Sequence, residues 1–336
     1  MPILYLAPLH GVTNRVFRYA YFKHFSGFDA AMAPFIQSVK AGSKMATHFK
    51  DLLPGYVPAY PVIPQILGND ASDFVDTARV VADLGYREVN WNLGCPYPMV
   101  TGKGRGSGLL PQPDRIDAFL DKVCMYSPIP VSVKLRLGFK DQHEILTLMP
   151  ILNRYPLAMV VIHPRLASQM YEGQVDLDGF EQARALSLHP VMYNGDIRDV
   201  QTYEALALRF PGIHQWMLGR GAISDPFLPA RIKGLSGCAG ETMGLSGLPS
   251  GPAKPPVDPA GQLSRIRAFH DDLLDAYQEI LSGQKHLMDK MKEVWTFLGP
   301  SCSADPRTLR SIAGTKNLAA YRVAVQQVFC SPGNLS

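Results

Sequence analysis

The sequence predicts an α/β protein: a (β/α)8 TIM barrel followed by a small all-α helical bundle. Over residues 1–233, short apolar runs alternate eight times with longer amphipathic stretches, as strands and helices do in a parallel barrel. Beyond residue 261 only helical periodicity remains, and a stretch rich in glycine and proline separates the two parts. We therefore expect a catalytic barrel domain at 1–233, a flexible linker at 234–261 and a helical domain at 262–331.

The candidate strands are the eight apolar runs Ile3–Leu6, Ala30–Ala33, Val62–Leu67, Glu88–Asn92, Val131–Leu135, Met159–Ile162, Val191–Tyr193 and Trp216–Leu218. The helical patterns between them are Ser72–Leu84, Asp114–Met125, His143–Arg154, Leu177–Leu186 and Asp199–Phe210. Asp70 is the expected N-cap of the first helix. A doubly wound open sheet is the alternative. It would place a Gly-x-Gly-x-x-Gly turn after the first strand, where this chain has Ala7-Pro8-Leu9-His10-Gly11.

Three amphipathic patterns follow the linker, at 263–281, 287–298 and 318–328. No strand pattern interrupts them, so they should pack as a small bundle.

The composition is that of an ordinary globular protein, with 46% hydrophobic and 18% charged residues. We expect no secretion signal and no membrane span, because no apolar run approaches about 18 residues. The five cysteines are scattered and include no Cys-x-x-Cys pair, which favours a reducing cytoplasm and argues against a disulfide framework or a metal site. The net charge of +4 permits an RNA partner without indicating one.

Unusual polar residues gather where the expected strands end, which is where a barrel carries its active site. They are His10, Gln65, Asn92, Cys95, Lys134, Arg136, His163, Arg165, Asn194, Asp196 and Arg220. Their chemistry suits flavin mononucleotide (FMN). The glycine turns Asn194-Gly195-Asp196 and Gly219-Arg220-Gly221 suit its phosphate, the amides of Gln65 and Asn92 suit the polar edge of the ring, and Lys134 suits the negative charge of the reduced ring. His163 could support either group.

Cys95 lies in a tight turn between Gly94 and Pro96, directly after the fourth strand. We expect this turn to hold the thiol at the edge of the sheet, where a substrate could reach it. The following stretch, Gly102 to Gly108, holds too many glycines for a helix or strand, so we expect a loop.

The string Asn92-x-Gly94-Cys95-Pro96, with Val100 and Gly106-Ser107, resembles the signature of the dihydrouridine synthases, flavoenzymes that reduce uridine in tRNA. Similar agreement is found at Pro8–Asn14, Val133–Gly138 and Leu218–Ala222. Trp91 and Leu9 depart from the residues usual in the family, and the segment His163-Pro164-Arg165-Leu166 departs enough to leave the role of Arg165 open.

The resemblance implies a barrel that binds FMN and takes its reducing equivalents from NADPH or NADH. It implies that Cys95 is the catalytic proton donor and that the C-terminal helical domain binds tRNA. The residues implied to bind FMN are Pro8, Leu9, His10, Gln65, Asn92, Lys134, His163, Asn194, Gly195, Asp196, Gly219 and Arg220.

Reduction of the uracil C5–C6 double bond needs a hydride at C6 and a proton at C5. A thiol with a pKa near ~8.5 is mostly protonated at neutral pH, so Cys95 can serve as the general acid. A nucleophilic thiolate would need a base nearby, and the sequence indicates none.

Two other functions stay open on the sequence alone. One is an FMN barrel reductase of a free small molecule, such as a pyrimidine or an enone, which would not need the helical domain. The other is an RNA-binding protein without catalysis, which would not need Cys95 or Lys134. The expected partner is tRNA, with rRNA as an alternative, contacted in part by Lys103, Arg105 and Lys140 at the barrel mouth. We expect a monomer that holds no metal and binds no membrane.

Overall fold

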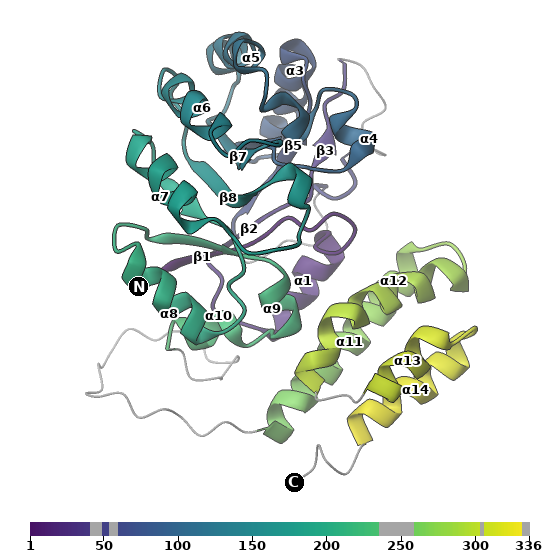
Figure 1. Ribbon diagram of the computed structural model, residues 1–336. Helices are drawn as coiled ribbons and strands as arrows, with labels where there is room; N and C mark the ends of the chain where they lie inside the picture. The colour runs from purple at the N-terminus through teal and green to yellow at the C-terminus, as the bar shows by residue number, and fades with distance from the viewer. Residues whose placement is uncertain (41–48, 54–59, 235–258, 303–305, 331–336) are drawn as a thin grey trace, which may run out of the picture. The chain divides into compact units, whose positions relative to one another are not determined.

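The computed structural model describes residues 1–40, 49–53, 60–234, 259–302 and 306–330 (Figure 1). The chain divides into two compact units. The first comprises Met1–Arg15, Asp29–Ile197 and Gln201–Gly219, and the second comprises Val16–Phe28, Arg198–Val200 and Arg220–Ser336.

The first unit is built on one parallel sheet of ten short strands. The strands are β1 (Ile3–Leu6), β2 (Ala30–Met32), β3 (Ile36–Gln37), β4 (Val62–Ile63), β5 (Gln65–Leu67), β6 (Val89–Leu93), β7 (Val131–Gly138), β8 (Val160–Leu166), β9 (Val191–Tyr193) and β10 (Gln215–Leu218).

The sheet closes on itself. Its order is β3-β5-β6-β7-β8-β9-β10-β1-β2-β4. β2 and β3 follow each other closely and act as one strand, and so do β4 and β5, which Pro64 separates. Because β2 pairs with β4 while β3 pairs with β5, the two ends of the order meet and eight strands form a ring. The predicted barrel is confirmed, and the open doubly wound sheet is wrong.

Amphipathic helices follow the strands: α3 (Ala71–Asp83), α5 (Pro113–Tyr126), α6 (Glu144–Leu152), α7 (Leu177–Leu186) and α8 (Val200–Arg209). The expected N-cap is confirmed, because the Asp70 carboxylate accepts a hydrogen bond of 2.9 Å from the backbone N–H of Asp73.

Two strands run further than predicted. β7 continues through Arg136 to Gly138, and β8 continues through His163 and Arg165 to Leu166. The prediction stopped at the apolar residues. The polar ones extend the strands because their side chains find partners inside the barrel unit. The Arg136 guanidinium, for example, donates 3.0 Å to the carbonyl of Gly94 and 2.8 Å to that of Leu166.

The predicted loop at Gly102–Gly108 is also wrong in part. A short helix, α4 (Pro98–Thr101), precedes it, and Gly106–Leu109 form one turn of 3-10 helix, η1. This glycine-rich turn is ordered because Ser107 binds the carbonyl of Cys95 through both its N–H and its hydroxyl.

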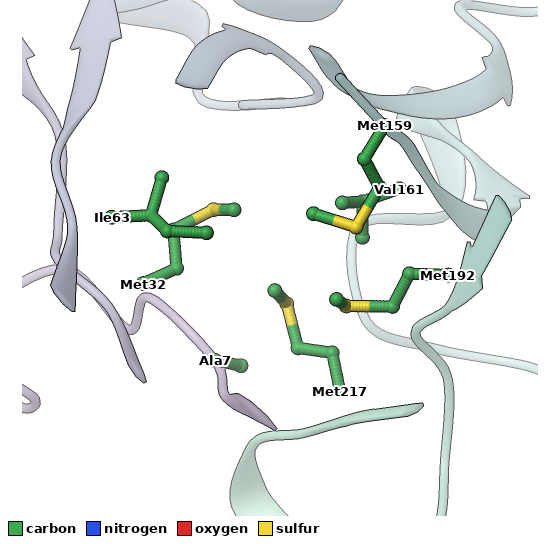
Figure 2. Packing of buried hydrophobic residues seen from close by; sticks show 7 residues of the cluster. All are labelled: Ala7, Met32, Ile63, Met159, Val161, Met192 and Met217. Carbon is green, nitrogen blue, oxygen red and sulfur yellow. The ribbon is translucent and has the colours of Figure 1, made fainter. Parts of the chain in front are cut away.

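One side of the barrel interior is filled by methionines. One cluster of seven buried residues contains Met32, Met159, Met192 and Met217 together with Ala7, Ile63 and Val161. Figure 2 shows these side chains converging from different strands on a common centre. Long unbranched side chains can fill such an irregular space. The strands β5, β6 and β7 instead direct polar residues inward.

The second unit is helical: α1 (Arg15–His24), α9 (Arg220–Ser224), α10 (Leu228–Ile232), α11 (Pro259–Ile280), α12 (Gln284–Leu298), α13 (Pro306–Gly314) and α14 (Leu318–Cys330). Its core includes Phe269 of α11, whose ring contacts Phe17 of α1 at 5.6 Å and Phe25 at 5.1 Å. Helices α1, α9 and α10, which the sequence grouped with the barrel, therefore pack in the helical unit.

The helical prediction needs two corrections. A fourth helix, α13, joins the three predicted ones, and α11 begins at Pro259, inside the predicted linker. Proline is well tolerated in a first helical turn, where its missing N–H has no intrahelical partner to lose. The rest of the predicted linker lies outside the described residues. No described helix combines the length and apolar character needed to cross a bilayer.

Candidate active site

The turn that carries Cys95 is held by hydrogen bonds from three directions. The Asn92 side-chain oxygen accepts from the backbone N–H of Gly94 (3.0 Å) and of Cys95 (2.9 Å). The carbonyl of Cys95 accepts from the N–H of Ser107 (3.1 Å) and from its hydroxyl (2.9 Å). Arg136 binds the carbonyl of Gly94. The backbone of the turn therefore has little freedom.

Gly106 is needed as glycine because of this turn. It has a φ of +54°, and a Cβ there would lie 2.7 Å from the Cys95 carbonyl oxygen and 3.1 Å from Cγ1 of Val100. The separated motif residues Asn92, Val100, Gly106 and Ser107 are therefore parts of one packed structure around Cys95.

The thiol of Cys95 is less accessible than predicted, because the residue is only 7% exposed. Burial raises its pKa, against smaller lowering effects of the Tyr97 backbone and the Arg136 and Lys134 cations. The thiol therefore stays protonated at neutral pH, as a general acid requires.

Lys134 lies beside Asn92 in the register of β6 and β7, and Arg136 follows on the same face of β7. Burial, and then the Arg136 charge, lowers the pKa of Lys134 to about 7. No carboxylate among the described residues offsets this shift. Two inward cations without an acid make this part of the barrel attractive to an anionic ligand.

The two amides expected at a ligand edge bind each other. The Asn92 amide donates 2.7 Å to the Gln65 carbonyl, and the Gln65 amide donates 2.8 Å to Asn90 and 3.3 Å to the sulfur of Met32. Both Gln65 amide protons are thereby used, and Asn92 keeps one. Asn90 was missed, although its alternation with Asn92 on a strand could have indicated an inward amide.

The structure resolves the contacts of Arg165. Its guanidinium is buried and forms a bidentate ion pair with Asp196. It also donates to the carbonyls of Glu172 (3.2 Å) and Gly173 (2.6 Å), and to Nε2 of His163 (3.2 Å). Because arginine can only donate, Nε2 of His163 must be the acceptor, and its ring proton is carried on Nδ1. Asp196, expected near a phosphate, is the counter-ion of Arg165.

The remaining expected ligand residues follow directly after β1, β9 and β10. Asn194 donates 2.9 Å to the carbonyl of Met217. A Cβ at Gly219 would lie 3.4 Å from that of Ala7 and 3.8 Å from the Leu9 side chain, and a Cβ at Gly195 would lie 3.2 Å from Pro164.

The Pro8–His10 segment is held by Thr13, whose hydroxyl accepts 2.8 Å from the N–H of Leu9. His10 is exposed and stacks on Phe35 with 5.0 Å between ring centroids. Arg220 is the first residue of α9 and belongs to the second unit, so its role as a ligand stays a prediction.

The expected cations at the mouth differ from one another. Lys103 and Lys140 are exposed. Arg105 instead bonds the side chains of Asn69 (3.3 Å) and Gln37 (3.4 Å), and the Asn69 amide binds the carbonyls of Lys103 and Gly104. Asn69 was missed by the sequence reasoning, and no pattern marks it.

A closed parallel barrel with a cysteine turn and inward-facing cations at the carboxyl ends of its strands defines a (β/α)8-barrel enzyme. Comparison with known families makes this specific. The model of the family described as Dihydrouridine synthase (Dus) matches residues 5–244, and the chain belongs to this family.

Individual relatives agree. A Rhodobacter capsulatus protein named "Probable tRNA-dihydrouridine synthase" is 30% identical, over 69% of this chain and 71% of its own length. A tRNA-dihydrouridine(16) synthase of Cupriavidus necator is 29% identical, over 70% of this chain and 74% of its own. Each alignment covers about two thirds of this chain or slightly more.

Among solved structures, morphinone reductase aligns with a TM-score of 0.51 at 14% identity, covering 70% of this chain and 86% of its own. At that identity the likeness concerns the fold alone, and it agrees with the closed barrel.

Proposed function

We propose that this protein reduces uridine in tRNA to 5,6-dihydrouridine, with FMN bound in the barrel, NADPH or NADH as the reductant, and Cys95 as the general acid. Membership of the Dus family makes the chain an oxidoreductase of the tRNA-dihydrouridine synthase type. The observation that supports the assigned roles most is local. The Cys95 turn is locked beside Lys134 and Arg136, two cations without an acidic partner among the described residues.

The residues present fit an anionic, planar cofactor. Lys134 and Arg136 supply positive charge that no carboxylate among the described residues neutralises, and Asn92 keeps one amide proton that a polar ring edge can accept. When bound, FMN would supply the hydride. Lys134 would hold the negative charge of the ligand, and His163, kept as the Nδ1–H tautomer by Arg165, would offer a donor.

Cys95 then holds the proton. Its thiol is kept neutral by burial, and the hydrogen bonds of the turn hold the Cys95 backbone at the end of β6. Pre-positioning of this kind lets a weak acid act without reorganisation.

The substrate base must leave its stack to enter a barrel mouth, so the rest of the RNA is held outside. The exposed Lys103 and Lys140 can contact phosphates, and so can the exposed cations of the helical unit. A monomeric state, a cytoplasmic location and the absence of a metal stay predictions.

The direct test compares dihydrouridine in RNA from cells with and without this protein, at nucleotide resolution. Specific uridines should lose the modification when the protein is missing, and should regain it with the wild-type chain but not with Cys95→Ala. Purified protein should also release FMN. An unchanged dihydrouridine map, or a protein that takes up no FMN, contradicts the proposal.

A further inference from the structure

A row of buried side-chain hydrogen bonds runs from the Cys95 turn into the barrel. The Asn92 amide donates 2.7 Å to Gln65, the Gln65 amide donates 2.8 Å to Asn90, and the Asn90 amide donates 3.0 Å to the hydroxyl of Ser132. None of these four side chains is more than 8% exposed. The row links β5, β6 and β7 across the polar half of the barrel interior.

The donor-to-acceptor direction of this row is determined at the end where it meets the Cys95 turn. The N–H groups of Gly94 and Cys95 can only donate, so the oxygen of Asn92 must face them and its amide nitrogen must face Gln65. The same requirement then orients Gln65 and Asn90 in turn. Reversal of any one amide would oppose two N–H groups or two oxygens, so all three must turn together or not at all.

The opposite end of the row, at Ser132, needs a hydrogen-bond acceptor. Ser132 accepts from Asn90, so its own hydroxyl proton must be donated elsewhere. Glu88 precedes Asn90 by two positions and so faces the same side of the strand, toward Ser132. Burial raises the pKa of its carboxyl, and a smaller lowering effect comes from a hydrogen bond with Ser132. Oε1 of Glu88 is buried and has no partner in the described part of the chain. No described cation contributes to the pKa shift of Glu88, so Ser132 is the polar group that this carboxylate meets in the row.

We propose that Glu88 and Ser132 are positioning residues: as the terminal acceptors of the row, they keep the Asn90, Gln65 and Asn92 amides in one orientation and so hold the Cys95 turn in place. Hydrogen bonds aligned in one direction polarise one another, by an estimated 10–30% per bond in condensed phases. A carboxylate at the accepting end strengthens every acceptor above it, including the Asn92 oxygen that binds the Cys95 N–H. The proposal rests on the proposed role of Cys95 as the proton donor.

The test uses four variants of the full-length FMN-bound protein. Ser132→Ala removes the last link, and Glu88→Leu removes the terminal acceptor. Glu88→Gln keeps a carbonyl that can accept from Ser132, so it is the conservative rescue. Gln215→Leu is the matched control, because Oε1 of Gln215 is also buried and unpartnered within the described residues but Gln215 takes no part in the row.

Two readouts separate positioning from packing. One is kcat and KM for uridine reduction in a tRNA transcript. The other is the rate at which iodoacetamide alkylates Cys95 in protein without substrate, followed by peptide mass spectrometry. Melting temperatures are measured in parallel. We expect Ser132→Ala and Glu88→Leu to lower kcat about three- to tenfold, the size of one net hydrogen bond, and to speed alkylation of Cys95. KM for tRNA should stay close to wild type in every variant. Gln215→Leu should keep the wild-type kcat and alkylation rate, and Glu88→Gln, which keeps the acceptor but loses the charge, should recover most of both.

The proposal is overturned if Ser132→Ala and Glu88→Leu keep both wild-type kcat and wild-type alkylation, or if Gln215→Leu matches their losses. Should either variant fail to fold, the remaining one and Glu88→Gln give the same comparison. Cys95→Ala distinguishes the proposed role of Cys95 as proton donor from the positioning role of Glu88 and Ser132. If it still reduces uridine, the proposed role of Cys95 fails; if it is inactive while Ser132→Ala is unchanged, only the positioning role fails.

Discussion

Gly106 approaches Cys95 so closely that a Cβ at position 106 would lie 2.7 Å from the Cys95 carbonyl oxygen and 3.0 Å from its Cβ. Both of those atoms belong to the locked turn, so neither can move aside as a flexible side chain would. The glycine is thus tied to the position of the proposed proton donor.

We predict that Gly106→Ala moves Cys95 and lowers kcat more than tenfold while FMN stays bound. The strain of a positive φ costs roughly 1 kcal/mol by itself. Gly104→Ala is the matched control, because Gly104 also has a positive φ (+62°) but its nearest neighbour is the flexible end of Arg115, at 3.4 Å. Equal losses of kcat in the two variants would mean that backbone strain, not contact with Cys95, is responsible.

The affinity for FMN should depend on pH through Lys134. In the ligand-free site its pKa is about 7, so above pH 7 the side chain is mostly neutral. An anionic ligand favours the charged form and raises this pKa, so binding takes up a proton and the dissociation constant rises as pH increases above 7. Titration calorimetry in two buffers of different ionisation enthalpy measures the uptake. Lys134→Met should abolish it, and uptake that persists in that variant would remove Lys134 from the site.

The buried ion pair of Arg165 and Asp196 should be strongly coupled. Arg165→Met removes the buried guanidinium that binds the Asp196 carboxylate and should lower the free energy of unfolding by about 3–5 kcal/mol. The double variant with Asp196→Asn should recover part of this loss. Urea unfolding of the four proteins gives the coupling. The exposed pair of Arg79 and Asp76 is the control, and its coupling should stay below about 1 kcal/mol. Additive losses at positions 165 and 196 would contradict the prediction.

Cys95→Ala should keep FMN and NADPH oxidation and lose about 10²–10⁴-fold in uridine reduction. Because burial raises the thiol pKa, wild-type kcat should fall only on the alkaline side, where the proton is lost. Burial also raises the pKa of Cys124 to about 11 and that of Cys302 to about 12, but Cys124 lies on the barrel helix α5 and Cys302 belongs to the helical unit, so neither follows a barrel strand as Cys95 does. Alanine at either position should leave uridine reduction near wild type, and comparable losses at all three would indicate a folding effect.

Much of this site was readable from the sequence because its signals are local. The positions of the strands follow from short apolar runs, although β7 and β8 continue beyond theirs, and the Gly94-Cys95-Pro96 turn needs no distant information. The row of hydrogen bonds from Asn92 to Ser132 could not be predicted from such local signals. Ser132 and Glu88 join it only because β6 and β7 pair in one register, and Arg165 faces Asp196 only once β8 and the residues after β9 are adjacent. Residue types alone suggested a phosphate ligand for Asp196, whereas the fold provides it with an arginine.

The last prediction concerns RNA binding by the helical unit, for which two simple designs are unsuitable. Deleting the chain from Gly234 onward would remove α11 and expose Phe17, Tyr21 and Phe25 of the second unit, which pack on Phe269. Reversing Lys290 and Lys292 would break contacts within the bundle. Lys290 pairs with Glu293 at 2.9 Å, and Lys292 donates 2.6 Å to the carbonyl of Thr315.

Three exposed cations of the helical unit have no ion pair within the described residues and are therefore suitable for the test: Lys285, Arg310 and Arg322. Their reversal to glutamate should weaken tRNA binding without changing the melting temperature or the FMN content. Each lost phosphate contact should also reduce the salt dependence of log K by about 0.7–0.9. Lys122→Glu, on a barrel helix, is the comparison for a change of net charge alone. The measurement is tRNA affinity at several salt concentrations. If the triple variant binds as tightly as wild type with the same salt slope, these helices do not contact the RNA through their exposed cations, and the barrel mouth must supply the binding.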